Sequence, residues 1–347
     1  MILEQNKYHK NFQFNGKSFS SVDEILDFSK NFSDEIYQFL KSWFSNDEHI
    51  IVLTSGSTGK PKSILLKKEF VINSAKATGN YFFLKENTTS LLCLPINYIA
   101  GKLMLVRAIT LGWKLDVVNS SSNPLKTIDK EYDFSAMVPL QLENSLSKIH
   151  LIKKLIVGGG VVSKELIRRI QNVSTAIFAT YGMTETITHI AVKKLNKVGY
   201  KPNFYQTLPN VSIYIDDRNC LVIKASKVSD VFVKTNDVVQ LISDSQFEWL
   251  GRFDNVINSG GIKLQPEKIE EKLSKIIYNR FFVIGISDNK LGEKLILIIE
   301  GESEVINYET TNLSRFEIPK ETYFVTKFIE TDTKKIQRKK TLDLLNL

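Results

Sequence analysis

A loop rich in hydroxyl groups and cations follows the apolar run at residues 49–53. Small residues let backbone N–H groups point inward, and ammonium groups attract anions, so such a loop can wrap phosphate oxygens. The alternative is a polar surface turn. The candidate phosphate-binding residues are Thr54, Ser55, Gly56, Ser57, Thr58, Gly59, Lys60 and Lys62.

This loop differs from the Walker A loop of P-loop NTPases. That motif needs a glycine where Thr54 stands and a serine or threonine where Pro61 stands. The sequence therefore predicts phosphate binding by another kind of loop.

A second reactive group of residues follows the apolar run 176–179, which we expect to be a strand. Strand ends are where α/β proteins place ligand contacts. An aromatic ring can stack on a purine, a hydroxyl can reach a phosphate, and a carboxylate can hold Mg²⁺. The alternative is a turn capped by a threonine. The candidates are Tyr181, Gly182, Met183, Thr184 and Glu185.

Further patterns lie closer to the C-terminal end. Asp237 taken alone indicates a turn residue. Residues 251–264 form a long segment, GRFDNVINSGGIKL, and residues 334–340 carry five bases in seven positions. A basic end of this kind by itself indicates a solvated or nucleic-acid-binding segment.

Taken in order, these motifs resemble the adenylate-forming superfamily of acyl- and aryl-CoA synthetases, adenylation domains and luciferases. The resemblance covers residues 50–340. It implies that a carboxylate attacks the α-phosphorus of ATP, giving an acyl-adenylate and pyrophosphate. A thiol then attacks the acyl carbon and releases AMP. The implied cofactors are ATP, Mg²⁺ and, as a co-substrate, coenzyme A.

The resemblance also implies roles in nucleotide binding. Tyr181 would pack on adenine, Thr184 would contact the α-phosphate, and Glu185 would support the metal. Asp237 would bind the ribose hydroxyls, and Arg252 the ribose or a phosphate. The glycines that resemble the family's adenine-side turn are Gly158, Gly159 and Gly160.

Other implied roles concern the small domain. Asp254 would be the hinge between domains, Gly260 and Gly261 would line the tunnel for the thiol, and Lys263 stands where the family has a basic residue. The family's catalytic lysine corresponds to Lys335, because the spacing to Ile336 and Arg338 fits. An ammonium group there can stabilise charge as pyrophosphate leaves.

The register at Lys335 has an alternative, because Lys334 replaces the glycine of the family motif. Two residues are candidates for the acyl pocket. Tyr98 occupies a place where related enzymes often carry an aromatic or histidine, and the alternative is a core aromatic. His189 could hydrogen-bond an acidic substrate, and the alternative is a structural polar residue.

The elements that would position these residues indicate an α/β fold. Short apolar runs at 91–94, 115–118, 155–157 and 176–179 alternate with helical patterns, which favours a mostly parallel sheet. Residues 34–44 predict an amphipathic helix. Short strands from 211 to 250 predict an antiparallel subdomain. Pro266 opens a helix whose apolar positions are Ile269, Leu273, Ile276 and Ile277.

We therefore expect a large α/β domain at residues 1–253, with a β-rich subdomain, and a small mobile α+β lid domain at 254–347. The chain has 347 residues. The family's members carry a longer portion before the phosphate loop, so we expect the wall of the acyl pocket to differ.

Composition indicates the cellular compartment and the kinds of partner to expect. Forty-six Lys and Arg against 38 Asp and Glu give a net charge of +8, which permits anionic partners of several kinds. Cys93 and Cys220 lie in apolar runs and predict buried, reduced thiols, which is typical of a cytosolic protein. The sequence shows no secretory signal and no run long enough to span a bilayer. We expect a cytoplasmic enzyme that binds neither nucleic acid nor membrane, and the oligomeric state stays open.

The motifs are most similar to the o-succinylbenzoate–CoA ligases of menaquinone biosynthesis, especially GGGVVS, YGMTETITHIA and LPINYIAGKLM. A small carboxylic acid, with o-succinylbenzoate favoured, would then be the substrate. One alternative is another acyl- or aryl-CoA synthetase, or an adenylation enzyme that loads a carrier protein. A more distant alternative is a non-catalytic protein that binds nucleotides or nucleic acid.

Overall fold

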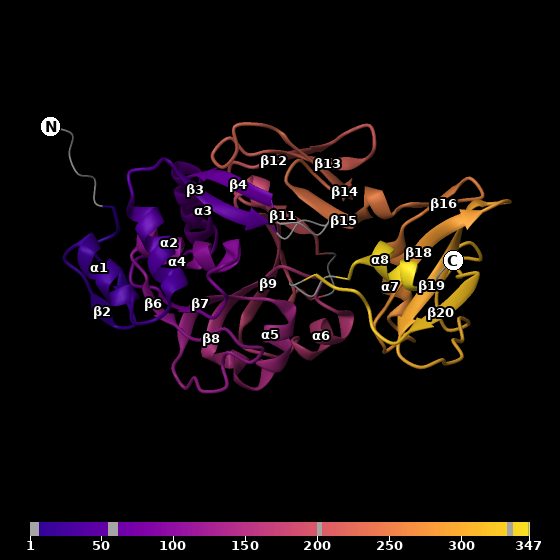
Figure 1. The fold of residues 1–347 in the computed structure, drawn as a ribbon, viewed down its shortest axis with the longest axis horizontal. Coiled ribbons are helices and arrows are strands. Elements are labelled where there is room, and N and C mark those ends of the chain that lie inside the picture. The colour runs from indigo at the N-terminus through magenta and orange to yellow at the C-terminus, as the bar shows by residue number, and fades with distance from the viewer. Residues whose placement is uncertain (1–6, 55–61, 200–202, 332–335, 346) are drawn as a thin grey trace. The chain divides into compact units, whose positions relative to one another are not determined.

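The computed structural model describes residues 7–54, 62–199, 203–331, 336–345 and 347 (Figure 1). The chain divides into two compact units. The first is built mainly from residues before Ser212 together with Ile223–Val233, and the second from Ile213–Val222 and Lys234–Leu347. Neither cysteine forms a disulfide, and both are buried, as predicted.

A mostly parallel sheet forms the centre of the first unit, as predicted. Its strand order is β11-β10-β9-β8-β7-β5-β6-β1-β2. The pairs β1–β6, β5–β6, β5–β7, β7–β8 and β8–β9 are parallel, whereas β10 is antiparallel to β9. The strands are β1 (Gln13–Phe14), β2 (Lys17–Ser18), β5 (Thr89–Leu92), β6 (Lys114–Val117), β7 (Tyr132–Met137), β8 (Ile152–Val157), β9 (Ala176–Gly182), β10 (His189–Lys194) and β11 (Tyr205–Thr207).

The predicted strand at 91–94 was placed too late, since β5 ends at Leu92. The next residues, 93 to 98, lead into α4 (Ile99–Leu111). Gly112 ends this helix in a left-handed conformation at φ 70°, which glycine adopts without strain. The chain then turns directly into β6.

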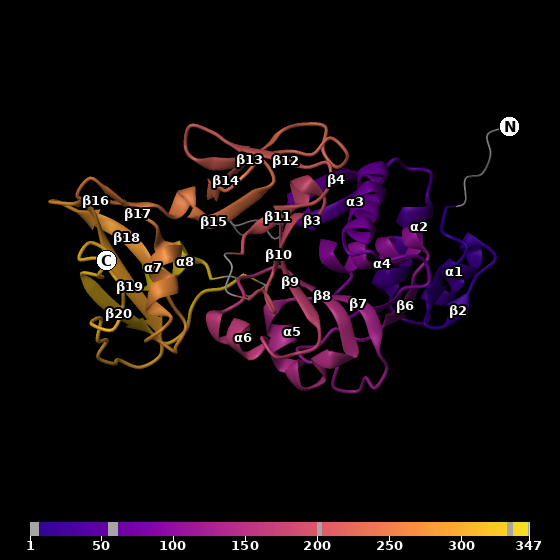
Figure 2. The same ribbon diagram turned by 180° about the vertical axis from the view of Figure 1, so that it is seen from behind.

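The helix predicted at residues 34–44 is confirmed, and serine side chains cap the N-termini of two helices of the first unit. Ser33 caps α2 (Asp34–Phe44), whose Leu40 and Trp43 are buried, and Ser163 caps α6 (Lys164–Arg169). Helices α3 (Lys68–Tyr81) and α4 lie side by side in both views (Figures 1 and 2). The remaining helices are α1 (Val22–Ser29), α5 (Pro139–Asn144) and the 3-10 turn η1 (Leu146–Leu151).

A separate hairpin carries the predicted phosphate loop. Strand β3 (His49–Thr54) is antiparallel to β4 (Lys62–Lys67), and Thr54 pairs with Lys62. Alternate residues point to opposite faces, so Ile50 is buried while Leu65 is 67% exposed.

The second unit contains two groups of strands. Strands β12 (Ser212–Ile215), β13 (Cys220–Lys224), β14 (Val233–Leu241) and β15 (Gln246–Arg252) are neighbours in that order. The 3-10 turn η3 (Phe253–Asn255) follows β15. The second sheet has the order β17-β16-β19-β18, with β20 beside β19. Its strands are β16 (Ile257–Ser259), β17 (Ile262–Leu264), β18 (Phe281–Asp288), β19 (Gly292–Glu300) and β20 (Glu321–Val325).

Both faces of this second sheet are covered. Helix α7 (Pro266–Leu273) covers one face, as Figure 2 shows. Its Ile269 and Leu273 pack in the core there. Leu342 of α8 (Arg338–Leu342) lies against the other, where η4 (Asp343–Leu345) also packs. The prediction that α7 extends to residues 276 and 277 was wrong. These residues still pack on the sheet, because the chain stays close to it after the helix ends.

The predicted α/β fold class is confirmed. None of the helices in the described part of the chain is long and apolar enough to cross a bilayer.

Candidate active site

The predicted site residues fall into three groups. Ser55, Gly56, Ser57, Thr58, Gly59, Lys60 and Lys335, with its alternative Lys334, lie outside the described residues. One described group belongs to the first unit and comprises Thr54, Lys62, Gly158–Gly160, Tyr181–Glu185, Tyr98 and His189. The other belongs to the second unit and comprises Asp237, Arg252, Asp254, Gly260, Gly261 and Lys263.

The glycine turn follows β8, at the carboxyl end of a parallel strand. The backbone N–H of Gly158 donates to the carbonyl of Met137 at 3.1 Å. A Cβ at Gly158 would lie 2.5 Å from Oγ1 of Thr180 on β9. Glycine is therefore required for this close approach, and the turn is held against both neighbouring strands.

The end of β9 carries the aromatic and hydroxyl residues predicted to contact the nucleotide. The ring of Tyr181 packs edge-on against Tyr205, with centroids 5.9 Å apart. Gly182 pairs with His189 of β10, and a Cβ at Gly182 would lie 2.2 Å from the carbonyl oxygen of Thr188. Only glycine lets the two strands approach so closely here. Thr184 and Glu185 then begin the short turn η2 (Thr184–Thr186).

A strained turn connects this motif to β10. Ile187 has φ 67° and ψ −57°, and the N–H of Thr188 donates to the carbonyl of Thr186 at 2.7 Å. This is a γ-turn of the rare, strained type. Such a conformation costs a β-branched residue about 1–3 kcal/mol, and it persists only where its surroundings enforce it. Ile187 is 2% exposed, so core packing holds the turn.

Two buried basic residues contact Thr188, which follows this turn. Arg107 of α4 is 3% exposed and His189 is 6% exposed. Nη2 of Arg107 donates to Oγ1 of Thr188 at 3.4 Å, and this oxygen lies 3.3 Å from Nδ1 of His189. Nε of Arg107 and Nε2 of His189 have no hydrogen-bond partner among the described residues.

Burial controls the charge of both side chains. It lowers the pKa of Arg107 to about 10, which leaves the guanidinium charged at neutral pH. Burial, aided by the positive charge of Arg107, lowers the pKa of His189 to about 3. His189 is therefore a neutral ring beside a buried cation. A buried charge of this kind is costly unless an anion or hydrogen bonds compensate it.

In the second unit, three predicted residues meet where β15 ends, opposite the middle of β14. Asp237 and Arg252 are cross-strand partners, and Nη1 of Arg252 lies 3.7 Å from Oδ1 of Asp237. Nη2 of Arg252 also pairs with Asp254 at 2.9 Å. Trp249 donates from Nε1 to Oδ1 of Asp237 at 3.1 Å. Asp237 is buried, and its contacts with Trp249 and Arg252 orient the carboxylate.

The two predicted tunnel glycines form a hairpin turn. Gly260 and Gly261, with φ of 59° and 80°, connect β16 to β17. Two positive φ angles in a two-residue loop match a type I′ turn, which glycine favours. Lys263 is exposed on β17, opposite Asn258.

The sequence pattern of the family described as AMP-binding enzyme matches residues 15–240. The chain belongs to the AMP-binding enzyme family. A 2-succinylbenzoate–CoA ligase of Staphylococcus epidermidis is 27% identical over 84% of this chain and 68% of its own length. The corresponding protein of Listeria monocytogenes is 25% identical, over 87% of this chain and 71% of its own length.

Solved structures support the same family. An acyl-CoA synthetase (AMP-forming)/AMP-acid ligase II-like protein from Dyadobacter fermentans is 36% identical, with a TM-score of 0.61. The match covers 90% of this chain and 93% of that one. An o-succinylbenzoate coenzyme A synthetase of Bacillus subtilis, in complex with ATP and magnesium, has a TM-score of 0.74 at 19% identity and shares the fold. That match covers 95% of this chain and 83% of the other.

The residues of this AMP-binding enzyme fit a magnesium ion carried by ATP. Glu185 is exposed and forms no ion pair with another described residue. Mg²⁺ is usually held by one or two carboxylates together with substrate phosphates. In the described part of the chain, no group of three or more metal-ligating side chains comes together.

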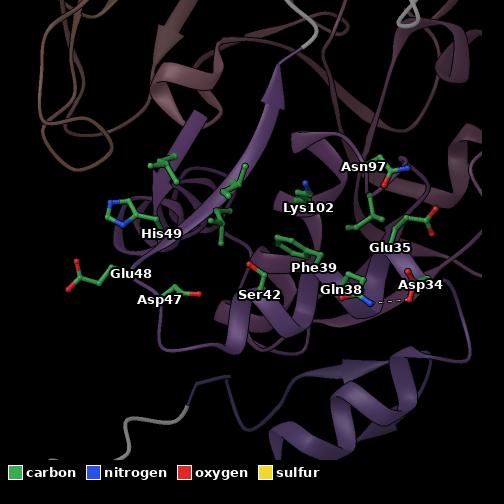
Figure 3. Close-up of a pocket in the computed structure, with 14 residues that line it drawn as sticks. Asp34, Glu35, Gln38, Phe39, Ser42, Asp47, Glu48, His49, Asn97 and Lys102 are labelled. Carbon is green, nitrogen blue, oxygen red and sulfur yellow. Dashed lines mark hydrogen bonds between the residues drawn. The ribbon is translucent and has the colours of Figure 1, made fainter. Parts of the chain in front are cut away.

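A pocket of about 770 Å³ lies in the first unit of the AMP-binding enzyme (Figure 3). Its walls include Phe39 and Lys102, and carboxylates of Asp34, Glu35 and Glu48. None of the described site residues lines it. Because carboxylates repel phosphates, this pocket is unsuited to ATP.

Tyr98 is 41% exposed and precedes α4, so the alternative that it is a core aromatic was wrong. The sequence reasoning missed Arg107. The signal was present, because a single arginine interrupts the apolar helix of residues 99–111, and arginines are almost never fully buried unless paired.

The neutral state of His189 makes a prediction for acid stability. Between about pH 3 and pH 6.5 the unfolded chain binds a proton at this histidine and the folded AMP-binding enzyme does not. Below pH 6.5 this histidine therefore lowers the free energy of unfolding by about 1.4 kcal/mol for each pH unit that the pH falls. Above pH 6.5 it has no such effect. Denaturant unfolding from pH 7 to pH 5 should therefore show a shallower decline for His189→Gln than for the wild type.

Replacement of the exposed His150 by glutamine is the matched control and should leave the slope unchanged. Parallel slopes for wild type and His189→Gln would contradict the burial of a neutral His189.

Proposed function

We propose that this AMP-binding enzyme joins 2-succinylbenzoate to coenzyme A, with ATP as the energy source and an acyl-adenylate as the intermediate. The names of its curated relatives support this reaction class and this acid. The buried free cysteines support a cytoplasmic setting, where thiols stay reduced. The proposed role is a step of menaquinone biosynthesis.

The observation that carries the substrate assignment is Arg107. It is a buried cation whose Nε has no hydrogen-bond partner among the described residues, and it forms no ion pair with a described carboxylate. 2-Succinylbenzoate has two carboxylates, so one remains ionised while the other is activated. That remaining carboxylate would compensate Arg107 with a charge-assisted hydrogen bond. A monocarboxylic acid would leave the guanidinium unpaired.

The site residues would share the chemistry as the family resemblance implies. Tyr181 and the glycine turn after β8 would hold adenine, and Asp237 and Arg252 the ribose. Thr184 would position the α-phosphate. Glu185 would hold Mg²⁺, which supplies charge neutralisation at the phosphates.

Residues of the phosphate loop, 54–60, and Lys62 would surround the β- and γ-phosphates through N–H, hydroxyl and ammonium groups. Lys335 would stabilise the charge that develops as pyrophosphate leaves. Gly260 and Gly261 would line the path of the thiol, with Lys263 beside them.

The deciding experiment is an ATP- and CoA-dependent ligation assay over a panel of acids. The panel contains 2-succinylbenzoate, benzoate, succinate, malonate and a fatty acid, and thioester and AMP are both measured. We expect the highest kcat/KM with 2-succinylbenzoate. A stronger signal with another acid would refute the substrate, and AMP release without thioester would favour transfer to a carrier protein. Salt-sensitive binding of DNA or RNA without AMP release would favour the non-catalytic alternative.

We also propose that the chain divides functionally at Asp254 into the domains 1–253 and 254–347, with rotation about this residue between the two half-reactions. The turn η3 contains Asp254, whose carboxylate accepts hydrogen bonds from Asn236 at 3.2 Å. Asp254→Pro fixes φ at this residue. It should leave adenylate formation near the wild-type rate and slow thioester formation at least roughly tenfold.

Pyrophosphate release and acyl transfer from supplied acyl-adenylate measure the two half-reactions separately. Asp254→Ala removes the same carboxylate without restricting the backbone and is the matched control. Normal overall turnover of Asp254→Pro would refute the hinge.

A further inference from the structure

The turn that contains the proposed hinge residue is contacted by side chains from other elements of the second unit. This turn, η3, connects β15 to β16, and each of its three residues has such a contact. Hinges are a few residues at the ends of elements that absorb large changes in φ and ψ. Contacts to such residues have to break or rearrange when the hinge turns, so they influence how readily it turns.

Arg218 holds the first two residues of the turn. It lies between β12 and β13, and its guanidinium carbon is 5.2 Å from the centroid of the Phe253 ring. Its Nη1 donates to Oδ1 of Asn236 at 2.9 Å, and Asn236 donates to both carboxylate oxygens of Asp254 at 3.2 Å. One cation thus contacts the turn directly, through a cation–π interaction, and indirectly, through an amide.

The guanidinium of Arg218 is itself fixed in orientation. Its Nε and Nη2 both donate to Oδ2 of Asp216, at 2.9 and 2.7 Å, and Nη2 also donates to the carbonyl of Thr235 at 3.1 Å. A planar guanidinium held by several hydrogen bonds keeps one orientation, which the single ammonium of a lysine does not reproduce. Arg218 is therefore a preorganised support for the turn.

Glu267 of α7 holds the third residue of the turn. Nδ2 of Asn255 donates to Oε1 of Glu267 at 2.5 Å. Oε2 of the same carboxylate lies so close to Gly251 that a Cβ added there would be 2.4 Å from it. Because β15 precedes the proposed hinge and α7 follows it, this carboxylate connects the two sides of the hinge.

The backbone of β15 is shaped for the contact with Glu267. Gly251 has φ 147°, and the pairing of β15 with β14 skips Leu250, which marks a β-bulge. Bulges bend a strand and are frequent beside functional sites. Any other residue at Gly251 would be strained at this φ and would collide with the carboxylate. Glycine at this position therefore allows α7 to pack against β15.

The contact at Glu267 is incomplete. Its Oε2 is buried and has no hydrogen-bond partner among the described residues. The cation that approaches α7, Arg338, pairs with Glu270. A buried oxygen without a partner regains hydrogen bonds to water when the contact opens. The contact is thus stabilised at one oxygen and penalised at the other, which suits a contact that forms in one of two states of similar free energy.

We infer that Arg218 and Glu267 are positioning residues that hold the hinge turn in one of the two arrangements that the half-reactions require. This inference rests on the proposed function and on the hinge proposed at Asp254. Arg218 acts from the part of the chain before the hinge, and Glu267 acts from the part after it. Loss of either contact changes the balance between the two half-reactions and leaves the residues assigned to ATP in place.

The test measures adenylate formation and acyl transfer separately in Arg218→Ala and Glu267→Ala. We expect the ratio of the two rates to change roughly 5- to 50-fold, the range of a typical conformational coupling, and in the same direction in both variants. Glu267→Gln keeps the size and the hydrogen bond to Asn255, so it should restore most of the wild-type ratio. Arg218→Lys keeps the charge without the planar fork and should give a smaller change than Arg218→Ala.

The matched controls are exposed residues of the same types. Glu271→Ala removes another carboxylate of α7, and Arg168→Ala removes an arginine of α6. Both should keep the wild-type ratio. Equal changes in the two half-reactions would overturn the inference and indicate a structural role. Opposite directions in Arg218→Ala and Glu267→Ala would overturn it as well.

Asp254→Pro provides a second criterion, because proline fixes φ at the proposed hinge. If Glu267 acts through the hinge, Glu267→Ala should change the ratio in the wild type and leave it unchanged in the Asp254→Pro background. A change of the same size in both backgrounds would overturn the inference.

Amide hydrogen exchange separates a failure of this inference from a failure of the proposed function. If the wild type activates another acid of the panel, the ratio is measured with that acid. If it activates none, the proposed function fails, and exchange at residues 253–255 decides about the contacts. Faster exchange in Arg218→Ala and Glu267→Ala than in the two controls would support them, and equal exchange would overturn the inference.

Discussion

Lys335→Ala is expected to slow acyl-adenylate formation by roughly 10²- to 10³-fold, the loss typical of removing a group that stabilises developing charge. Thioester formation from supplied acyl-adenylate should stay near the wild-type rate. The two rates are measured as pyrophosphate release and as acyl transfer to coenzyme A. Equal losses in both half-reactions would refute the role of Lys335.

Two features allow this variant to fold. Ile336 pairs with Glu330, and Arg338 forms a bidentate ion pair with Glu270 of α7, with contacts of 2.8 and 2.9 Å. The segment that follows Lys335 is thus anchored without its side chain. Lys334→Ala is the matched control and should be close to wild type. If Lys334→Ala proves the more damaging change, the catalytic register is shifted by one residue.

Arg107→Met is expected to raise KM for 2-succinylbenzoate by roughly 10- to 150-fold, which corresponds to the 1.5–3 kcal/mol of a hydrogen bond to a charged group. Methionine has a similar length and no charge, so KM for a monocarboxylic acid should stay unchanged or fall. Steady-state kinetics with both acids show whether KM rises for 2-succinylbenzoate alone.

Thermal unfolding provides a control for Arg107→Met. Replacing an uncompensated buried charge by an apolar side chain should preserve or raise the melting temperature. Arg107→Lys keeps the charge but loses the planar fork, so it should lie between the wild type and Arg107→Met in KM. A rise in KM that is equal for both acids would contradict the pairing of Arg107 with a second carboxylate.

Much of the fold followed from local patterns in the sequence. The apolar spacing of residues 34–44 located α2, and the apolar runs at 155–157 and 176–179 located β8 and β9. The end of α7 was misjudged, because Ile277 continues the helical spacing although it reaches the core from outside the helix. The spacing of apolar residues indicates which residues are buried. It does not indicate where the backbone hydrogen bonds of a helix end.

Candidate site residues could be named from the sequence where they form contiguous motifs. Tyr181, Gly182 and Asp237 were named because each lies in a short segment that resembles a family motif, and their contacts with the nucleotide stay predictions. Arg107 and the γ-turn at Ile187 were not found. Their roles depend on contacts between α4 and β10, about 80 residues apart in the chain, and no local pattern reports such contacts.

The turn at Ile187 limits how this enzyme can be engineered for stability. Glycine at that position would relax the backbone, but it would also delete a buried side chain, and that loss costs about 2–5 kcal/mol, against a relieved strain of about 1–3 kcal/mol. The same relaxation would free Thr188 and His189 from their alignment opposite Gly182. We therefore expect glycine at this turn to lower the melting temperature, so a thermostable form of the enzyme is better sought in the second sheet.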